Sequence, residues 1–240
     1  MKRRDFLKVA GVAGIGVPGI IASGALGAGG RPAASDRIVM GCIGLGGQGD
    51  RDMRSFLGDK RVQVVALCDV DTGSENYENG WRRGIAQAKE AVEKRYGGKG
   101  IYTTQDFREL LARTDIDAVT CATPDHWHAA VVVAAARAGK DIYCQKPVSH
   151  SIADGRAMVR AVKRYARVFQ CGSQRRSSAR CRRSCELVRN GRIGKLHTIH
   201  VGLPSGHYNP RSGTPAARIM SVPKSLDYNM WLGPAPAAPY

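Results

Sequence analysis

Short apolar runs that alternate with longer amphipathic stretches constrain this fold more than any other feature of the chain. The runs are "RIVMGCIGL", "VQVVALCDV", "DAVTCATP", "KDIYCQKP" and "RVFQCGS". Continuous runs rich in β-branched residues suit strands that are buried on both faces. Helical patterns lie between them, one after Gln48 and the others over 78–97, 106–113, 126–139 and 152–166. This strand–helix–strand order predicts an α/β protein with a parallel, doubly wound sheet.

The first apolar run leads into a G-x-G-x-x-G turn, which is typical of dinucleotide binding. The first glycine permits a tight turn, the second lets backbone approach a pyrophosphate, and the third lets helix and strand pack closely. The helix that follows presents its N-terminal N–H groups to phosphate. The residues expected to bind the cofactor here are Gly44, Gly46, Gly47, Gln48 and Gly49.

Asp69 ends the next apolar run, about twenty residues after the last of these glycines, where dinucleotide-binding folds carry an acidic residue. A carboxylate there accepts hydrogen bonds from the adenosine ribose and repels a 2′-phosphate. The sequence therefore predicts NAD as the cofactor. NADP is left open because Arg82 and Arg83 lie in the same region of the chain.

Two later strand ends are expected at the same sheet edge, because parallel strands present their carboxyl ends together. Thr123 and Pro124 end one of them and are expected to contact the cofactor. His128 follows, either as a cofactor contact or as a packing or capping histidine. His126 and His128 are two residues apart and do not share a helix face, so no metal site is predicted.

Lys146 ends the other strand, between Gln145 and Pro147, and both Gln145 and Lys146 are expected to bind the cofactor. The proline stops the strand and fixes the turn. An ammonium group at this edge would donate hydrogen bonds beside the nicotinamide. The alternative is a lysine whose head group extends into solvent. Position alone leaves both readings open.

The first 35 residues are typical of an export signal. A charged start with Arg3 and Arg4 is followed by Phe6, Leu7 and a glycine-rich apolar stretch. The arginine pair predicts the twin-arginine route and a periplasmic or extracellular protein. The apolar stretch is short for a membrane span, so no stable span is expected after processing. An uncleaved anchor helix is the alternative.

The formal net charge of +17 raises the question of nucleic acid, but no nucleic-acid-binding signature accompanies it, and no such partner is expected. The densest basic cluster, 174–192, is interpreted as a solvated helix face, with docking of acidic sugars or polyanions as the alternative. Of the seven cysteines, five fall in predicted strands as small buried residues, and none has zinc-site spacing. No metal and no disulfide framework are predicted.

After Ser173 the pattern changes to a helix, a turn at Asn190-Gly191 and a strand over 196–203. The last stretch is rich in Pro and Gly. It reads as the start of a second domain, and Trp231 and Tyr240 are large apolar side chains with little chain left to cover them.

The glycine turn, "ATPDHWHA" and "YCQKPVSHSIADGRAMV" together resemble the Gfo/Idh/MocA family of glucose-fructose oxidoreductases and inositol dehydrogenases. The export signal and "VFQCGSQRRS" are similar to its secreted bacterial branch. The resemblance implies that Lys146, in the family's E-K-P motif, binds substrate and assists proton transfer. It also assigns the glycine turn and Asp69 to the cofactor. The motif's glutamate is Gln145 in this chain.

The predicted signal peptide covers 1–35, and the resemblance implies a Rossmann domain over 36–172 and an incomplete α/β substrate domain over 173–240. It implies an NAD(P)-dependent oxidoreductase that transfers a hydride to or from a sugar or polyol, and it leaves a homo-oligomer open. The family's catalytic Asp and His lie beyond Tyr240, so the chain is expected to be truncated. The alternatives are an NAD-dependent glycosidase and a non-catalytic NAD-binding fragment.

Overall fold

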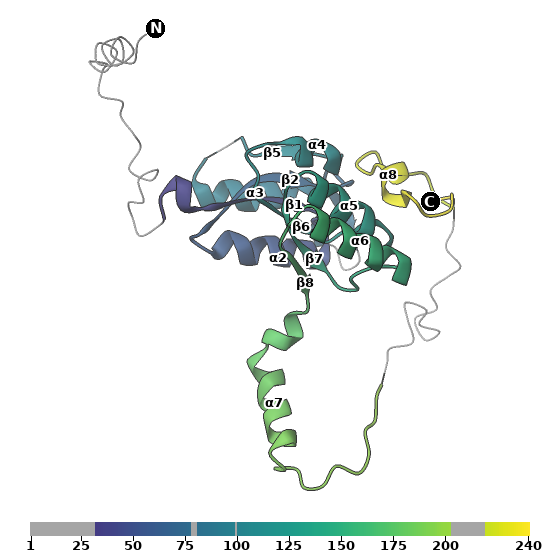
Figure 1. The fold of residues 1–240 in the computed structure, drawn as a ribbon. Helices are drawn as coiled ribbons and strands as arrows, with labels where there is room; N and C mark the ends of the chain where they lie inside the picture. The colour runs from purple at the N-terminus through teal and green to yellow at the C-terminus, as the bar shows by residue number, and fades with distance from the viewer. Residues whose placement is uncertain (1–31, 78–80, 99, 203–218) are drawn as a thin grey trace, which may run out of the picture.

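The computed structural model describes residues 32–77, 81–98, 100–202 and 219–240 (Figure 1). The predicted export signal therefore lies almost wholly outside the described residues. A short 3-10 helix, Ala34–Asp36, precedes the first strand.

The centre of the molecule is a six-stranded sheet in the order β5-β2-β1-β6-β7-β8, and every neighbouring pair in it is parallel. The order reverses between β1 and β6, which is the switch point where doubly wound sheets bind dinucleotides. The predicted Rossmann sheet is confirmed. Its strands are β1 (Ile38–Ile43), β2 (Val62–Cys68), β5 (Tyr102–Thr104), β6 (Ala118–Cys121), β7 (Asp141–Gln145) and β8 (Phe169–Gly172).

Helices cover both faces of the sheet, and each face has its own apolar core (Figure 1). Helices α2 (Gly47–Gly58) and α3 (Ile85–Tyr96) pack on one face through residues such as Met53 and Val92. Helices α4 (Phe107–Ala112), α5 (Asp125–Arg137) and α6 (Ile152–Arg164) pack on the other. Burial on both sides explains why the strands read as continuous apolar runs.

The cysteines follow the prediction. The four central strands of the sheet, β2, β1, β6 and β7, each carry a fully or nearly fully buried thiol, and β8 carries one that is partly buried. All seven are free thiols. The strand cysteines are Cys42, Cys68, Cys121, Cys144 and Cys171.

The predicted helix over 78–97 is wrong over 81–84, the first described residues of that range. Strand β3 (Ser74–Tyr77) pairs antiparallel with β4 (Trp81–Arg83), and the helix begins only at Ile85. Gly84 separates the two elements with φ of 92°, and a Cβ there would lie 2.5 Å from the carbonyl oxygen of Asp71. A helix cannot continue through this backbone conformation, which only glycine adopts readily.

The chain leaves the sheet after β8 through a 3-10 helix, Gln174–Ser177, into α7 (Ala179–Arg189). Helix α7 has no buried residue and stands away from the Rossmann domain (Figure 1). This exposure agrees with the interpretation of the basic cluster as solvated. The strand predicted over 196–203 is not formed in its described part, 196–202, because no described strand lies beside it to pair with its backbone.

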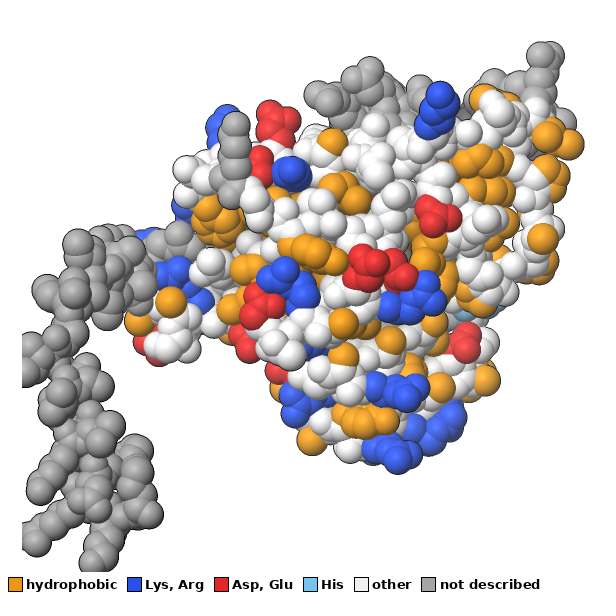
Figure 2. Space-filling view, turned by 90° about the horizontal axis from the view of Figure 1, so that it is seen from above, with side chains coloured by type: hydrophobic (Ala, Val, Ile, Leu, Met, Phe, Trp, Pro, Cys, Tyr) orange, Lys and Arg blue, Asp and Glu red, His pale blue; other side chains and the backbone are white. Residues whose placement is uncertain are grey.

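The chain returns to the Rossmann domain at α8 (Tyr228–Leu232), which lies near α5 (Figure 1). On the face that Figure 2 shows, Lys and Arg side chains are spread among acidic and hydrophobic ones. Among the described residues, no helix is long and apolar enough to cross a membrane.

Candidate functional site

The glycine turn connects β1 to α2 at the carboxyl edge of the sheet. Gly44 has φ of 82°, and its N–H donates to the carbonyl oxygen of Cys68 over 2.9 Å. A Cβ on Gly49 would lie 1.9 Å from the carbonyl oxygen of Gly44, so no side chain fits there. Gly46 is the N-cap of α2, which begins at Gly47. The turn has the tight, closely packed geometry that its sequence predicts.

Asp69 lies buried at the end of β2, directly beside this turn. One carboxylate oxygen accepts from the N–H of Leu45 over 2.5 Å, and the other accepts from the N–H of Asp71 over 2.9 Å. Burial raises the pKa of Asp69 to about 6, although these backbone donors oppose the shift. The negative charge of Asp71 raises the pKa further.

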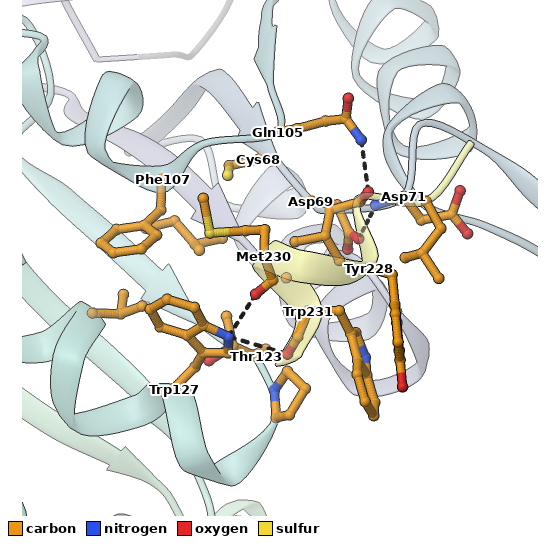
Figure 3. A pocket seen from close by; sticks show the side chains of 18 of the residues that line it. Cys68, Asp69, Asp71, Gln105, Phe107, Thr123, Trp127, Tyr228, Met230 and Trp231 are labelled. Carbon is orange, nitrogen blue, oxygen red and sulfur yellow. Dashed lines mark hydrogen bonds between the residues drawn. The ribbon is translucent and has the colours of Figure 1, made fainter. Parts of the chain in front are cut away.

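A cavity of about 640 Å³ opens on this edge (Figure 3). Asp69 lines it together with the backbone of the turn at Gly44 and Gly46, and with Thr123 and Pro124 at the end of β6. The rest of the lining is largely apolar and aromatic. It comprises Ile43, Cys68, Val70, Asp71, Gln105, Phe107, Ala122, Trp127, Val131, Pro223, Leu226, Tyr228, Met230, Trp231, Pro239 and Tyr240.

His128 is buried in α5 and joins two loops at this edge instead of lining the cavity. Its Nδ1 lies 2.7 Å from the carbonyl oxygen of Pro147, and its Nε2 lies 2.9 Å from that of Thr123. The geometry favours the packing or capping role. Helix α5 itself is preceded by Pro124 as its N-cap, so Asp125 is its first residue and not its cap.

Gln145 and Lys146 lie at the end of β7, and only Gln145 is buried. The Gln145 side chain donates to Asp52 Oδ2 over 2.5 Å and accepts from the backbone N–H of Lys146 over 3.1 Å. Gln48 donates to Asp52 Oδ1 over 2.8 Å. Two predicted cofactor residues, Gln48 and Gln145, are thus joined through a buried carboxylate in α2, and the Lys146 side chain is exposed.

One cluster has the composition of a metal site. Single ligand atoms of Cys121, His128 and Cys144 lie within 4.8 Å of one another. Both ring nitrogens of His128 already contact carbonyl oxygens, however, so a metal would have to displace one of those contacts. The absence of a metal remains a prediction.

Arg83 is turned toward the first turn of α2. Its Nη1 lies 3.5 Å from Asp50 Oδ2, and its side chain is 9% exposed. An arginine held by a carboxylate is a weaker partner for a 2′-phosphate than an exposed one. The Arg82 side chain lies outside the described part of the structure.

Several cavity residues were not predicted from the sequence. Gln105 and Phe107 follow β5, a strand of three half-buried residues with no apolar run to mark it. Trp127 stands between the two histidines of "DHWH". The last unpredicted cavity residues are Tyr228, Met230 and Trp231. They are separated by about a hundred residues of sequence from α5, which they contact, and no local sequence pattern indicates such a contact.

Two family models match the chain. One, described as an oxidoreductase family with an NAD-binding Rossmann fold, matches residues 38–173. The other, described as the C-terminal alpha/beta domain of an oxidoreductase family, matches residues 179–240.

Individual proteins agree with these matches. The inositol 2-dehydrogenase of Salmonella paratyphi B is 27% identical over 201 residues, which cover 81% of this chain and 54% of that protein. A glycosyl hydrolase family 109 protein of Solibacter usitatus is 31% identical over 156 residues, 62% of this chain and 34% of that one. The crystal structure of myo-inositol 2-dehydrogenase from Lactobacillus plantarum superposes with a TM-score of 0.53 at 25% identity, covering 67% and 43% of the two chains.

The chain thus spans about half the length, or less, of the relatives it matches. The Rossmann model alone covers more than half of the chain and includes the glycine turn, Asp69 and Lys146. The chain therefore belongs to the Gfo/Idh/MocA family of oxidoreductases, and its N-terminal domain is an NAD-binding Rossmann fold.

Proposed function

We propose that this chain holds NAD(H) along the carboxyl edge of its sheet and serves hydride transfer to or from a hydroxyl-bearing carbon of a sugar or polyol. The observation that carries the proposal is the convergence of the glycine turn and the Asp69 carboxylate on one cavity. The inositol dehydrogenases among the relatives support a polyol substrate.

The residues present fit a dinucleotide. Glycine at position 49 allows α2 to pack directly against the turn, where no side chain would fit. The closed turn can then hold a pyrophosphate at the N-terminus of α2. Each Asp69 oxygen accepts one backbone N–H and retains a lone pair for a ribose hydroxyl. Of the two arginines that could reach a 2′-phosphate, Arg83 is the one whose side chain the structure describes, and it faces Asp50, which favours NAD.

When bound, the nicotinamide ring supplies the hydride acceptor or donor, and the protein supplies orientation and proton handling. Lys146 is the catalytic residue in this proposal. Its exposed ammonium group donates a hydrogen bond to the substrate hydroxyl and assists transfer of the hydroxyl proton. Gln145 positions it, because the Gln145 side chain is fixed to Asp52 on one side and to the Lys146 backbone on the other.

The test is NAD binding by the full chain, followed by NADH formation with a panel of inositols and sugars. We expect Lys146→Met to bind NAD as tightly as the wild-type chain and to lose substrate-dependent NADH formation. Gly49→Ala should lose NAD binding itself. If Lys146→Met forms NADH at the wild-type rate, the role assigned to Lys146 is wrong.

An NAD-dependent glycosidase is the second candidate, supported by the similarity to a glycosyl hydrolase family 109 protein. Release of the phenol from an aryl glycoside without net NADH would favour it over the dehydrogenase. A chain that binds NAD and turns over neither class of substrate would favour a non-catalytic NAD-binding role.

Export by the twin-arginine route is a further part of the proposal, supported by Arg3 and Arg4 ahead of the apolar stretch. A reporter fused behind residues 1–35 should reach the periplasm. Replacing both arginines by lysine should stop it, and unchanged export in that variant would contradict the route.

A further inference from the structure

Backbone hydrogen bonds join the segment 223–240 to the loop that follows Asp69. The N–H of Asp227 donates to the carbonyl oxygen of Val70 over 2.9 Å, and the N–H of Thr72 donates to that of Ser225 over 2.9 Å. Asp71 and Leu226 form an antiparallel bridge between these two bonds. The segment therefore extends the site at the residues next to the predicted ribose carboxylate.

A second attachment joins the segment to α5. The Trp127 indole N–H donates to the carbonyl oxygen of Met230 over 2.8 Å, and His126 Nε2 lies 3.0 Å from the carbonyl oxygen of Trp231. Trp127 also packs edge-on against Phe107, with ring centroids 5.5 Å apart. With hydrogen bonds to both sides, the segment spans from the loop after β2 to α5 and lines the cavity between them (Figure 3).

The position of the cavity identifies which part of a dinucleotide it would receive. Asp69 and the glycine turn line it, and Lys146, the residue assigned to the reactive end, does not. A ribose held by Asp69 places its purine within a few ångströms, away from the pyrophosphate at the turn. The adenosine half therefore falls inside the cavity, and the nicotinamide half falls outside it.

The wall that the segment contributes is aromatic. The rings of Tyr228 and Trp231 are stacked, with centroids 5.8 Å apart and planes 15° apart, and Tyr240 packs edge-on against Tyr228. Trp231 remains 40% exposed although its tryptophan side chain is large and apolar. Partly exposed aromatic faces of this kind are what purine rings stack on in other nucleotide sites.

We infer that segment 223–240 forms the outer wall of an adenine subsite, with Trp231, backed by Tyr228, as the stacking surface. The inference rests on the proposed NAD site and adds residues from the region matched by the C-terminal domain model. Cofactor affinity then depends on contacts from both matched regions of the chain.

The experiment measures binding of NAD and ADP-ribose to the full chain by calorimetry. ADP-ribose keeps the adenosine and pyrophosphate and lacks the nicotinamide. We expect Trp231→Ala to weaken both ligands by about 5- to 20-fold, which is the lower part of the range for loss of one base–aromatic stack. Trp231→Phe, which retains an aromatic face, should stay within about threefold of wild type.

Ile219→Ala is the matched control, because Ile219 precedes the same segment, is 79% exposed and does not line the cavity. It should bind both ligands like the wild-type chain. Reduced nicotinamide mononucleotide, which lacks adenosine, should bind wild type and Trp231→Ala equally.

The inference is overturned if Trp231→Ala binds ADP-ribose like the wild-type chain, or if it loses the mononucleotide by the same factor as NAD. Either result would leave the proposed function intact, because that proposal depends on NAD binding by the wild-type chain and not on Trp231. A wild-type chain that binds neither NAD nor ADP-ribose would instead refute the proposed function.

Discussion

Gln145→Glu is the substitution that most directly tests how the end of β7 is held. In the structure the Gln145 amide donates to the buried carboxylate of Asp52 over 2.5 Å. Glutamate at this position removes the donor and places a second carboxylate against the first. The variant restores the E-K-P motif of the family, yet the surroundings in this chain are built for an amide.

The size of the effect follows from the contact. Two unit charges about 4 Å apart repel by about 4 kcal/mol at an effective dielectric constant of about 20. Loss of a buried charge-assisted hydrogen bond adds about 1–3 kcal/mol. Relaxation, water entry and the sharing of a proton between the two carboxyl groups remove part of the sum. We expect a net loss of about 3–5 kcal/mol in the free energy of unfolding, which is large against the usual total of about 5–15 kcal/mol.

Asp52→Asn in the same chain should restore stability. An asparagine amide at position 52 can donate to the new glutamate, while its oxygen still accepts from Gln48, and the glutamate still accepts from the backbone of Lys146. The exchanged pair reproduces all three hydrogen bonds with one charge. The double variant should therefore unfold within about 1 kcal/mol of the wild-type chain, and the two changes should be strongly non-additive.

Urea unfolding followed by circular dichroism measures all four proteins of this cycle. Asp52→Asn alone should lose about 1–2 kcal/mol, because two amide donors then face each other. The reasoning is refuted if Gln145→Glu is as stable as the wild-type chain. It is equally refuted if Gln145→Glu costs the same in the Asp52→Asn background as in the wild-type one.

Three further outcomes are expected. Burial raises the pKa of Asp69 to about 6, and ribose hydroxyls donate to its ionised form. NAD affinity should therefore fall by up to about tenfold per pH unit below pH 6. The variant Asp69→Asn should show a flatter pH profile. A calorimetric profile that is flat across this range in the wild-type chain would contradict it. Gly49→Ala should lose NAD binding in the same titration, since its Cβ would lie 1.9 Å from the Gly44 carbonyl oxygen; retained affinity would show that the turn can rearrange. His128→Ala should lower the free energy of unfolding by about 2–4 kcal/mol, because it leaves a void and two carbonyl groups without their ring contact, and a urea midpoint equal to wild type would exclude this linking role.

The sheet was predictable because its strands are buried on both faces. Apolar content alone marks such strands, and the order of the elements along the chain then predicts parallel pairing. The edge strand β5 escaped prediction, since Tyr102–Thr104 is short and half-buried. The start of α3 was missed because its limit, the positive φ of Gly84, depends on a tertiary contact with Asp71.

The sequence predicts the backbone conformation of the glycine turn, but it does not predict the long-range side-chain contacts of the site. The geometry of the glycine turn is local, so its spacing in the sequence predicts it. The partner of Gln145 is Asp52, which lies more than ninety residues earlier, and an isolated aspartate in an amphipathic helix gives no sign of that contact. Trp231 read as an uncovered apolar residue for the same reason, because its neighbours lie in α5.

The two ends of the proposed cofactor site have different roles: the adenosine end at Asp69 determines the affinity for the cofactor, and the reactive end at Lys146 determines turnover. Asp69 is buried at the base of a cavity with aromatic walls, and that cavity does not include Lys146. Lys146 is exposed, and its backbone is held by the buried pair of Gln145 and Asp52. Substitutions around the cavity should therefore change the dissociation constant of any ligand that contains adenosine. Substitutions at Lys146 should change turnover and leave that constant in place, because no described contact joins the Lys146 side chain to the cavity wall.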